Sequence, residues 1–289
     1  MSTALACVSV NKTYGRTAAL RSLDLTLEEN VIYGLLGRNG AGKTTLLNTI
    51  AGGIYADSGT IEVWGKKLAN GELPGDFCYV RENHKSLGSA RVIQVLKYAS
   101  AFHPNWDWTF AHKLLDIFRL DPNKKIRQLS RGMESLVGNI IGLASRAPLT
   151  VYDEPVLGLD VLMRERFYKM LLEDYANHPR TILLSTHLID EIAPVAERVY
   201  ILEDGAVLLH DEMERIRMSA HLIRGNADAV AAFTAGKRVL HTESYGRGTL
   251  AAIYGQLGEN DKQQAQESGI SIESLTLQKF FSYLIEGGN

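Results

Sequence analysis

Eight residues, Gly37-Arg-Asn-Gly-Ala-Gly42-Lys43-Thr44, have the types and spacing needed to hold phosphate groups. They match the pattern G-x-x-x-x-G-K-[ST] at every fixed position. Glycines let the backbone curl so that successive N–H groups face one anion, and Lys43 adds a full positive charge. The hydroxyl of Thr44 is an oxygen ligand of the kind that Mg²⁺ accepts. The segment therefore predicts a loop that binds the phosphates of a nucleotide, with Lys43 at the β- and γ-phosphates.

A pair of carboxylates stands at the end of a second apolar run, Leu149-Thr-Val-Tyr-Asp153-Glu154-Pro155. Ligands bind just outside the carboxyl ends of the strands in open parallel sheets, so this pair should lie near the phosphate loop. We expect Asp153 to bind Mg²⁺, directly or through water. We expect Glu154 to orient and polarise a water molecule for attack on a phosphate. Acidic strand ends are common, and it is the phosphate loop that favours the functional interpretation here.

The elements that must position these residues alternate between strands and helices. A short apolar run at residues 31–36 precedes the glycines, and a helix at residues 44–51 follows them. The runs at residues 149–152 and 181–185 are typical of buried parallel strands. This alternation predicts an α/β fold with a mostly parallel sheet.

Composition narrows the class of function. The chain has 289 residues, 45% of them hydrophobic, and a net charge of -2, which favours a folded protein of about two domains. No run of five basic residues occurs, so no nucleic-acid partner is expected. No segment approaches the roughly 18 apolar residues that span a bilayer, and no signal peptide is visible. Two cysteines and scattered histidines predict neither a disulfide framework nor a zinc site.

The chain divides into two unequal parts. We expect a first domain at residues 1–215, interrupted at about 84–145 by a helical insert, and a small C-terminal α/β accessory domain at residues 216–289. The closing helix, at residues 275–285, has an apolar face that packs either on its own domain or on a partner. That face consists of Leu275, Leu277, Phe280, Phe281 and Leu284.

Three further motifs accompany the loop and the carboxylates. Leu129-Ser130-Arg131-Gly132-Met133 precedes the acidic strand, Gly158-Leu159-Asp160 follows it, and Ser185-Thr186-His187 ends the next strand. Together, in this order, the five motifs resemble the ATP-binding cassette family over residues 5–213. The resemblance implies a P-loop nucleoside triphosphatase cassette, with a RecA-like core sheet, an antiparallel β subdomain and a helical insert. It also implies that the protein hydrolyses ATP with Mg²⁺.

The resemblance implies a role for several residues within one cassette. Tyr14 matches the aromatic residue that stacks on adenine, the alternative being a core or turn tyrosine. His187 matches the switch histidine that reaches the γ-phosphate, and with Lys43 and Glu154 it completes the implied catalytic set. The residues implied to hold the nucleotide in the phosphate loop are Gly37, Asn39, Gly40, Gly42, Lys43, Thr44 and Thr45.

Other matched residues imply a dimer. Ser130 and Gly132 match signature residues that contact the γ-phosphate bound by a second cassette, and Asp160 matches an aspartate that acts across the dimer. The sequence departs from the family pattern where Arg131 replaces the usual first glycine and Met133 replaces the usual glutamine. The retained serine and glycine lead us to expect a working but slower site.

A further departure concerns the metal. Glu82 stands where the family usually has glutamine, and the resemblance implies that it joins Thr44 and Asp153 as a Mg²⁺ ligand. Glutamate keeps an oxygen for the metal but lacks the amide donor. The alternative is that the true loop residue lies one or two positions away.

The resemblance implies an ATPase subunit of a transporter. Dimer closure on ATP would drive transport, in the export direction, through a separate membrane-spanning permease subunit. The second cassette would be an identical or a different chain, and the protein would lie at the cytoplasmic face of the cell membrane. The alternatives are a cassette ATPase acting on ribosomes or DNA, or a regulatory cassette that uses ATP as a switch. Measured ATPase activity with and without a membrane partner separates these functions.

Overall fold

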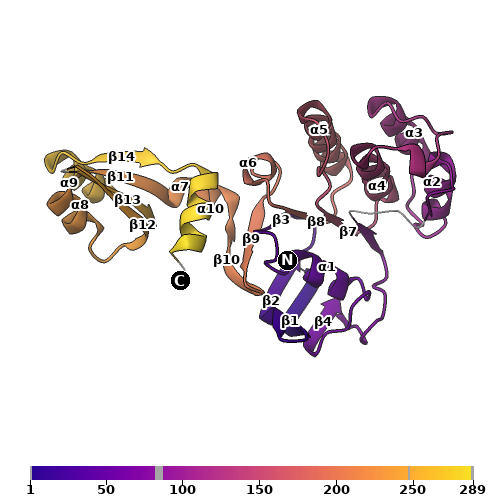
Figure 1. Ribbon diagram of the computed structural model, residues 1–289, viewed down its shortest axis with the longest axis horizontal. Coiled ribbons are helices and arrows are strands. Elements are labelled where there is room, and N and C mark those ends of the chain that lie inside the picture. Colours follow the sequence, from indigo (N-terminus) through magenta and orange to yellow (C-terminus); the bar gives the residue numbers. More distant parts are fainter. Residues whose placement is uncertain (1, 82–86, 247, 288–289) are drawn as a thin grey trace. The chain divides into compact units, whose positions relative to one another are not determined.

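The computed structural model describes residues 2–81, 87–246 and 248–287 of the chain. They form two compact units (Figure 1). The cassette unit comprises Met1–Leu188 and Val195–His210, and the C-terminal unit comprises Ile189–Pro194 and Asp211–Asn289. The main boundary thus lies after residue 210, whereas the sequence led us to expect it after residue 215. The mixed strand and helix composition confirms the predicted α/β fold class.

The cassette unit starts with a four-stranded antiparallel sheet in the order β2-β1-β4-β5. Along β2, Leu23, Leu25 and Leu27 are buried while the residues between them are exposed. This period of two is typical of a sheet with one face on a core and one in water. The strands are β1 (Thr3–Tyr14), β2 (Thr17–Glu28), β4 (Ser58–Val63) and β5 (Lys66–Lys67).

A six-stranded sheet in the order β10-β9-β3-β8-β7-β6 forms the centre of the cassette unit. Its strands are β3 (Ile32–Gly37), β6 (Phe77–Val80), β7 (Leu149–Asp153), β8 (Thr181–Thr186), β9 (Arg198–Glu203) and β10 (Ala206–Glu212). All residues of β3, β7 and β8 are buried, as in parallel strands covered on both faces. Strand β3 pairs in parallel with β8, and β8 with β7. The carboxyl ends of these three strands therefore meet at one edge.

Layers cover both faces of the central sheet. Figure 1 shows α1 (Lys43–Ile50) and the antiparallel sheet on one side, with α4 (Arg131–Ser145) and α5 (Val161–Asn177) on the other. Leu46, Leu47 and Ile50 of α1 join one apolar core with residues of both sheets. Burying such a side chain contributes about 1.5–3 kcal/mol. The helix that follows the phosphate loop is therefore firmly anchored.

The helical insert consists of α2 (Val92–Ser100), α3 (Trp108–Ile117), the short 3₁₀ helix η2 (Ile126–Gln128) and α4. The carboxylate of Asp107 accepts a hydrogen bond from the backbone N–H of Phe110 at 2.8 Å, which fixes the start of α3. Helices α2 and α3 both contact α4. Because α4 ends near β7, the insert is attached to the central sheet through this helix.

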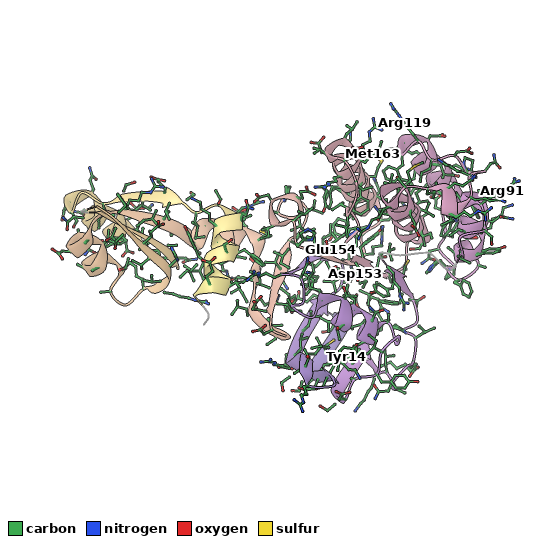
Figure 2. The ribbon with its side chains drawn as sticks, in the orientation of Figure 1. Tyr14, Arg91, Arg119, Asp153, Glu154 and Met163 are labelled. Carbon is green, nitrogen blue, oxygen red and sulfur yellow. The ribbon has the colours of Figure 1, made fainter. Side chains whose placement is uncertain are left out.

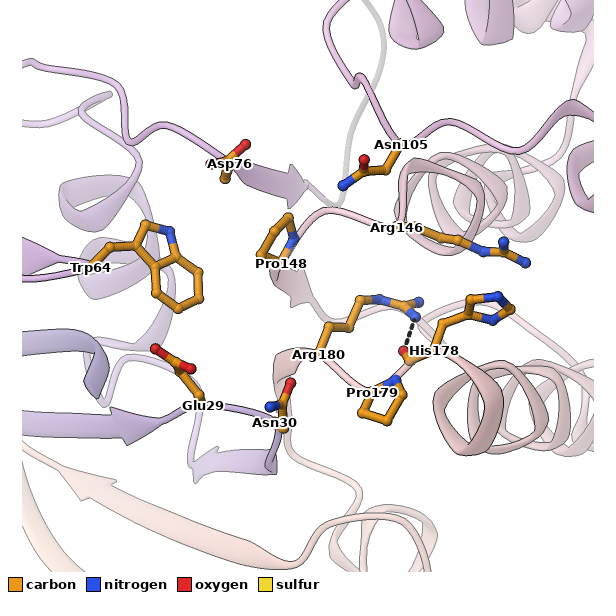
Figure 3. Close-up of a pocket in the computed structure, with 10 residues that line it drawn as sticks. All are labelled: Glu29, Asn30, Trp64, Asp76, Asn105, Arg146, Pro148, His178, Pro179 and Arg180. Atoms are coloured by element: carbon orange, nitrogen blue, oxygen red, sulfur yellow. Dashed lines mark hydrogen bonds between the residues drawn. The ribbon is translucent and has the colours of Figure 1, made fainter. Parts of the chain in front are cut away.

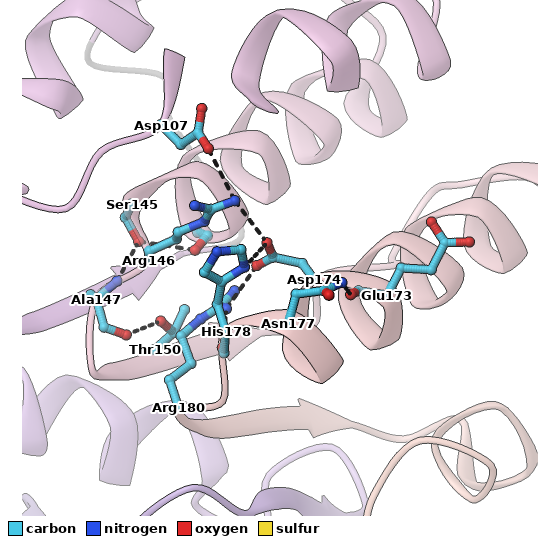
Figure 4. A network of polar contacts seen from close by, with 11 residues as sticks. Asp107, Ser145, Arg146, Ala147, Thr150, Glu173, Asp174, Asn177, His178 and Arg180 are labelled. Carbon is cyan, nitrogen blue, oxygen red and sulfur yellow. Dashed lines mark hydrogen bonds and ion pairs between the residues drawn. The ribbon is translucent and has the colours of Figure 1, made fainter. Parts of the chain in front are cut away.

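A polar network centred on the buried Asp174 ties these helices to the amino end of β8 (Figure 4). The carboxylate of Asp174, in α5, lies 2.7 Å from Arg180, 3.3 Å from Arg146 and 3.4 Å from His178. Arg146 also lies 3.0 Å from Asp107. The network therefore links α3, the end of α4, α5 and the start of β8 through one carboxylate.

A cavity of about 690 Å³ adjoins this network (Figure 3). It is lined by Asn30, Pro148 and Arg180, which precede β3, β7 and β8, and by residues of both charges. Ligands of parallel sheets bind at the opposite, carboxyl ends of the strands. The arginines here are already paired with Asp174, so the cavity indicates no particular ligand.

The C-terminal unit contains a β-α-β-β-α-β succession, the split βαβ or ferredoxin-like arrangement. Its antiparallel sheet has the order β12-β13-β11-β14, and a core that includes Val230 and Phe233 lies between the sheet and helix α8. The sequence led us to expect a small α/β domain here, and the structure supplies the six elements of this succession. The six elements are β11 (Ala220–Asn226), α8 (Ala227–Thr234), β12 (Arg238–Tyr245), β13 (Gly248–Tyr254), α9 (Glu259–Glu267) and β14 (Ser271–Ser274).

Three more helices belong to the C-terminal unit: α6 (Ile189–Ile192), α7 (Met213–Ser219) and α10 (Leu277–Glu286). The predicted apolar face of the closing helix is largely buried within this unit. Helix α10 contacts β12 and α6, and the ring of Phe280 lies 5.0 Å from that of Tyr254. Of the two interpretations of this face, the structure favours packing within its own domain.

Candidate active site

The phosphate loop connects β3 to α1 as the sequence predicts. Gly40 and Gly42 have φ of 90° and 103°, a region that glycine adopts without strain. A Cβ atom at Gly42 would lie 2.5 Å from the carbonyl oxygen of Ala19, so no other residue fits there. The Lys43 ammonium donates to the Gly37 carbonyl oxygen at 2.7 Å. The loop is thus curled around its own lysine at the amino end of α1, where the helix dipole favours an anion.

Lys43, Glu154 and His187 form a charged cluster at the carboxyl ends of β3, β7 and β8. One Glu154 oxygen lies 3.7 Å from the Lys43 Nζ, and the other lies 3.0 Å from the His187 Nδ1. Glu154 has φ of 51°, a left-handed conformation that is strained for a residue with a side chain. Its backbone N–H donates to the Ser185 carbonyl oxygen at 3.1 Å. Neighbouring strands therefore hold Glu154 in an unfavourable conformation that aims its carboxylate at the cluster, as functional sites often do.

Asp153 is buried beside this cluster and held by hydrogen bonds. Its Oδ1 accepts from the Ser185 hydroxyl at 2.6 Å and its Oδ2 from the Tyr79 hydroxyl at 3.4 Å. Burial and the nearby carboxylate raise the pKa of Tyr79, so this hydroxyl stays protonated and donates. Remaining lone pairs on the carboxylate suit a hard cation such as Mg²⁺, which takes one or two carboxylates plus phosphate oxygens and water. Among the described residues no three His, Cys, Asp or Glu gather into a complete metal site.

A cavity of about 540 Å³ opens over the phosphate loop and the charged cluster. Its volume falls within the range of about 300–1,000 Å³ usual for small-molecule sites. The glycine loop, the buried lysine and the clustered polar groups fit the triphosphate of a nucleotide. The residues that line it are Ala19, Arg38, Asn39, Gly40, Gly42, Lys43, Thr44, Thr45, Arg131, Glu154, Leu157 and His187.

Helix α4 is fastened to the segment that follows Glu154. The Asn139 amide donates to the Pro155 carbonyl oxygen at 2.9 Å, and the Ser135 hydroxyl to that of Leu157 at 3.2 Å. A Cβ atom at Gly132 would collide with the carbonyl oxygen of Gly158. The first turn of α4 therefore packs directly against the backbone next to Glu154.

Several residues that the sequence singled out do not line this cavity. Tyr14 is 47% exposed at the end of β1, well separated from Glu154 in Figure 2. The Ser130 hydroxyl caps α4 by accepting a hydrogen bond from the Met133 N–H at 3.3 Å. The Asp160 carboxylate caps α5 in the same way, by accepting a hydrogen bond from the Met163 N–H at 2.9 Å. Gly132 packs against Gly158 as described. Glu82, the expected additional Mg²⁺ ligand, lies outside the described residues.

Sequence reasoning missed Ser185, Tyr79 and Arg38 as parts of the site. Ser185 was noted only within a motif, yet its place at the end of β8 is opposite Asp153 in the parallel register. Tyr79 lies on β6, and no local pattern in the sequence indicates that β6 pairs with β7. Arg131, noted as a departure from the family pattern, lies at the cavity.

Comparison with known proteins decides the family. The family profile described as "ABC transporter" matches residues 20–157. An uncharacterized ABC transporter ATP-binding protein of Methanocaldococcus jannaschii, MJ1023, is 30% identical over 213 residues, which cover 72% of this chain and 77% of that protein. The chain belongs to the ABC transporter ATP-binding proteins. It is therefore an ATP-hydrolysing subunit of an ABC transporter.

Two further similarities extend this identification. The bacitracin transport ATP-binding protein BcrA of Bacillus licheniformis is 25% identical over 313 aligned positions, which cover 100% of this chain and 99% of BcrA. The dimeric structure of MJ0796, a bacterial ABC transporter cassette, matches with a TM-score of 0.64 at 23% identity, over 72% of this chain and 98% of that one. The latter shows that this ABC ATPase has the cassette fold. No helix in the described ranges is both long and apolar enough to cross a bilayer.

Proposed function

We propose that this ABC ATPase powers export through a separate membrane-spanning permease, at the cytoplasmic face of the cell membrane. The observation that carries the proposal is the similarity to BcrA, which extends over the C-terminal unit as well as the cassette. The name of that relative refers to bacitracin transport, which favours an antibiotic-resistance type of exporter. Members of the family work as cassette dimers with membrane partners, and we propose the same arrangement here, without the participation of nucleic acid.

The proposed hydrolysis follows from the cluster at the cavity. Lys43, whose ammonium now contacts Gly37 and Glu154, binds the β- and γ-phosphates of ATP. Glu154, held between Lys43 and His187, orients the attacking water, and His187 reaches the γ-phosphate. Thr44 and Asp153 hold Mg²⁺, which supplies neutralisation of phosphate charge when bound. Phosphoryl transfer needs mainly positioning and charge stabilisation, and these side chains provide both.

We propose that the residues outside the cavity act on the nucleotide of a second cassette. Ser130 and Asp160 are exposed, and two exposed apolar residues, Val161 at 69% and Leu162 at 52%, follow Asp160. Exposed apolar groups of this kind suit a protein interface. Contacts made only in the closed dimer shift the equilibrium towards closure when ATP binds. Tyr14 is proposed to stack on adenine from its exposed position.

The proposal is tested by transport into inside-out membrane vesicles. The chain is expressed with a candidate permease of about six membrane spans, and labelled peptide antibiotic is added with ATP. Export predicts accumulation inside these vesicles that is lost with Lys43→Ala. Stimulated ATPase activity without accumulation would refute export. ATP binding with negligible hydrolysis, with or without the permease, would instead support the ATP-dependent switch.

A further inference from the structure

The tip of the hairpin formed by β1 and β2 carries Tyr14, the last residue of β1. Tyr14 pairs with Thr17 across a two-residue turn, and the pairing of the two strands shifts in register between Lys12 and Thr13. Exposed chain ends and loops open locally at little cost in free energy. A side chain that binds a ligand from such a tip therefore depends on other parts of the chain to hold it.

Asp57, which directly precedes β4, holds this tip. Its Oδ2 accepts a hydrogen bond from the Thr13 N–H at 2.6 Å, and its Oδ1 accepts one from the Lys12 ammonium at 2.9 Å. The N–H of Asp57 donates to the Asn11 carbonyl oxygen at 2.8 Å. An exposed ion pair alone contributes little to stability, but these three bonds reach the three residues that immediately precede Tyr14. Asp57 therefore fixes the backbone from which the Tyr14 ring projects.

The ring of Tyr14 is itself in contact with this arrangement. The Lys12 ammonium lies over the ring, 5.5 Å from its centroid, a distance at which a cation and an aromatic ring attract each other. Asp57 keeps this ammonium in place. The hydrogen bonds from Lys12 and Thr13 lower the pKa of the Asp57 carboxyl, so it is ionised at neutral pH. Nearly half of the Tyr14 surface is exposed, so the ring still has surface on which a planar base can stack.

Asp57 also ends the segment that leads from α1 to β4, residues 51–57. The start of this segment is fixed on α1, because the N–H groups of Gly53 and Ile54 both donate to the Asn48 carbonyl oxygen, at 2.9 and 3.2 Å. Its end is fixed on β1 through the bonds of Asp57. A short connection that is fastened at both ends therefore joins the helix after the phosphate loop to the tip that carries Tyr14.

We infer that Asp57 is a positioning residue that, together with Lys12, holds Tyr14 ready to stack on the base of the bound nucleotide. The inference rests on the proposed stacking of Tyr14 on adenine. Ordering one flexible side chain during binding lowers affinity by about two- to tenfold. A ring that is ordered before the nucleotide arrives avoids this loss. The role concerns the base alone, because Lys43 and the glycine loop hold the phosphates.

Binding of two ligands to the full chain tests the inference. ATP and inorganic tripolyphosphate, which has the phosphates but no base, are titrated by calorimetry in EDTA. We expect Asp57→Ala to weaken ATP binding about two- to tenfold and to change tripolyphosphate binding less than about twofold. Lys12→Met keeps an apolar stem without the charge, and it should cause part of the same loss. In ATPase assays of Asp57→Ala the KM for ATP should rise while kcat is unchanged, because the chemistry at the phosphates is untouched.

Glu72→Ala is the matched control. The Glu72 carboxylate likewise accepts from a lysine ammonium, that of Lys66 at 2.6 Å, and from a backbone N–H, that of Ala69 at 2.9 Å. Lys66 lies over no aromatic ring among the described residues, so ATP affinity should not change in this variant.

A double variant shows whether Asp57 acts through Tyr14. Tyr14→Ala should weaken ATP binding at least about fivefold, the effect of losing one stacked ring. Tyr14→Ala combined with Asp57→Ala should bind ATP as weakly as Tyr14→Ala alone, because no ring is left to position.

Three results would overturn the inference. They are unchanged ATP affinity in Asp57→Ala, equal weakening of ATP and tripolyphosphate binding, and an effect of Asp57→Ala that persists in full when Tyr14 is already alanine. Failure of the underlying proposal is recognised separately. If Tyr14→Ala leaves ATP affinity unchanged, Tyr14 does not stack on adenine. If Tyr14→Ala weakens ATP binding and Asp57→Ala does not, only the positioning role of Asp57 is wrong.

Discussion

Replacement of Ser185 by alanine should weaken both the fold and the active site. The fully buried Ser185 hydroxyl donates to the Asp153 carboxylate at 2.6 Å and accepts from the Glu154 N–H at 3.1 Å. A hydrogen bond to a buried charged group contributes about 1.5–3 kcal/mol. Loss of the second bond costs less, because the Glu154 N–H also donates to the Ser185 carbonyl oxygen. We therefore expect the free energy of unfolding to fall by about 2–3 kcal/mol.

The same change should slow hydrolysis. Without the hydroxyl, Asp153 keeps, among the described residues, only the longer side-chain bond from Tyr79, at 3.4 Å, and its carboxylate can shift. A displacement of about 1 Å at a reacting centre costs up to about a hundredfold in rate. We expect kcat to fall at least about tenfold. ATP affinity measured without Mg²⁺ should change little, because Lys43 and the glycine loop are untouched.

Ser145→Ala is the matched control for this experiment. Ser145 is also fully buried, and its hydroxyl makes two hydrogen bonds, to the Gly142 carbonyl oxygen at 2.9 Å and from the Ala147 N–H at 3.3 Å. It lies at the far end of α4, and neither of these hydrogen bonds involves a carboxylate. Urea unfolding and steady-state ATPase assays are run on both variants. Equal kcat values for Ser185→Ala and Ser145→Ala would refute the idea that Ser185 positions the carboxylates.

Three other outcomes follow from the structure. Glu154→Gln should retain ATP binding and reduce the rate of ATP hydrolysis at least about a hundredfold. The variant should also form a more stable dimer, measured by size-exclusion chromatography. Near-normal turnover would contradict the proposed role of Glu154 in orienting the attacking water. Asp174→Asn should lower the free energy of unfolding by about 3 kcal/mol, because it leaves the buried guanidinium charge of Arg180 uncompensated. The control is Glu173→Gln, which removes an exposed ion pair and should lower the free energy of unfolding by less than about 0.5 kcal/mol. Equal losses of stability in the two variants would argue against the network. Burial lowers the pKa of His103 and of His221 below the usual 6.5, because it disfavours the charged imidazolium. The contribution of these neutral side chains to stability is therefore complete above about pH 6.5. It is lost as the pH falls through their lowered pKa values. Thermal unfolding from pH 7.5 to 5 should show this loss, and His103→Asn with His221→Asn should reduce it.

The phosphate loop and the acidic strand could be predicted because their chemistry is local in sequence. Glycines, lysine and threonine lie within the eight residues that run from the end of β3 into the start of α1, and Asp153 is adjacent to Glu154. The support for these residues is not local. Ser185 reaches Asp153 across a register set by strand order, over a separation of 32 residues, and Tyr79 does so over 74. Nothing in the spacing of these residues along the chain specifies which strands become neighbours.

The C-terminal unit contains a helix and a strand that the sequence pattern does not indicate. Helix α9, with the sequence ENDKQQAQE, buries only Ala265, so it lacks the apolar stripe that indicates a packed helix. Strand β14 is four residues long and mostly exposed. Strand β14 forms because β11 provides a pairing edge for it, and helix α9 contacts β14. Weakly patterned elements at the edge of a sheet depend on tertiary contacts that propensity does not describe.

The C-terminal unit includes a short segment that follows His187 in the sequence. Residues Ile189–Pro194 begin two positions after His187, yet they belong to the C-terminal unit. Within that unit α6 contacts α10, and the Arg217 guanidinium donates to the Ala193 carbonyl oxygen at 2.7 Å. Removal of residues 216–289, the domain expected from the sequence, would leave this segment without those contacts and uncover the fully buried Ile192. We therefore expect the truncated protein to lose ATPase activity while retaining ATP binding through the phosphate loop. A truncated protein with full kcat would show that the position of His187 does not depend on the C-terminal unit.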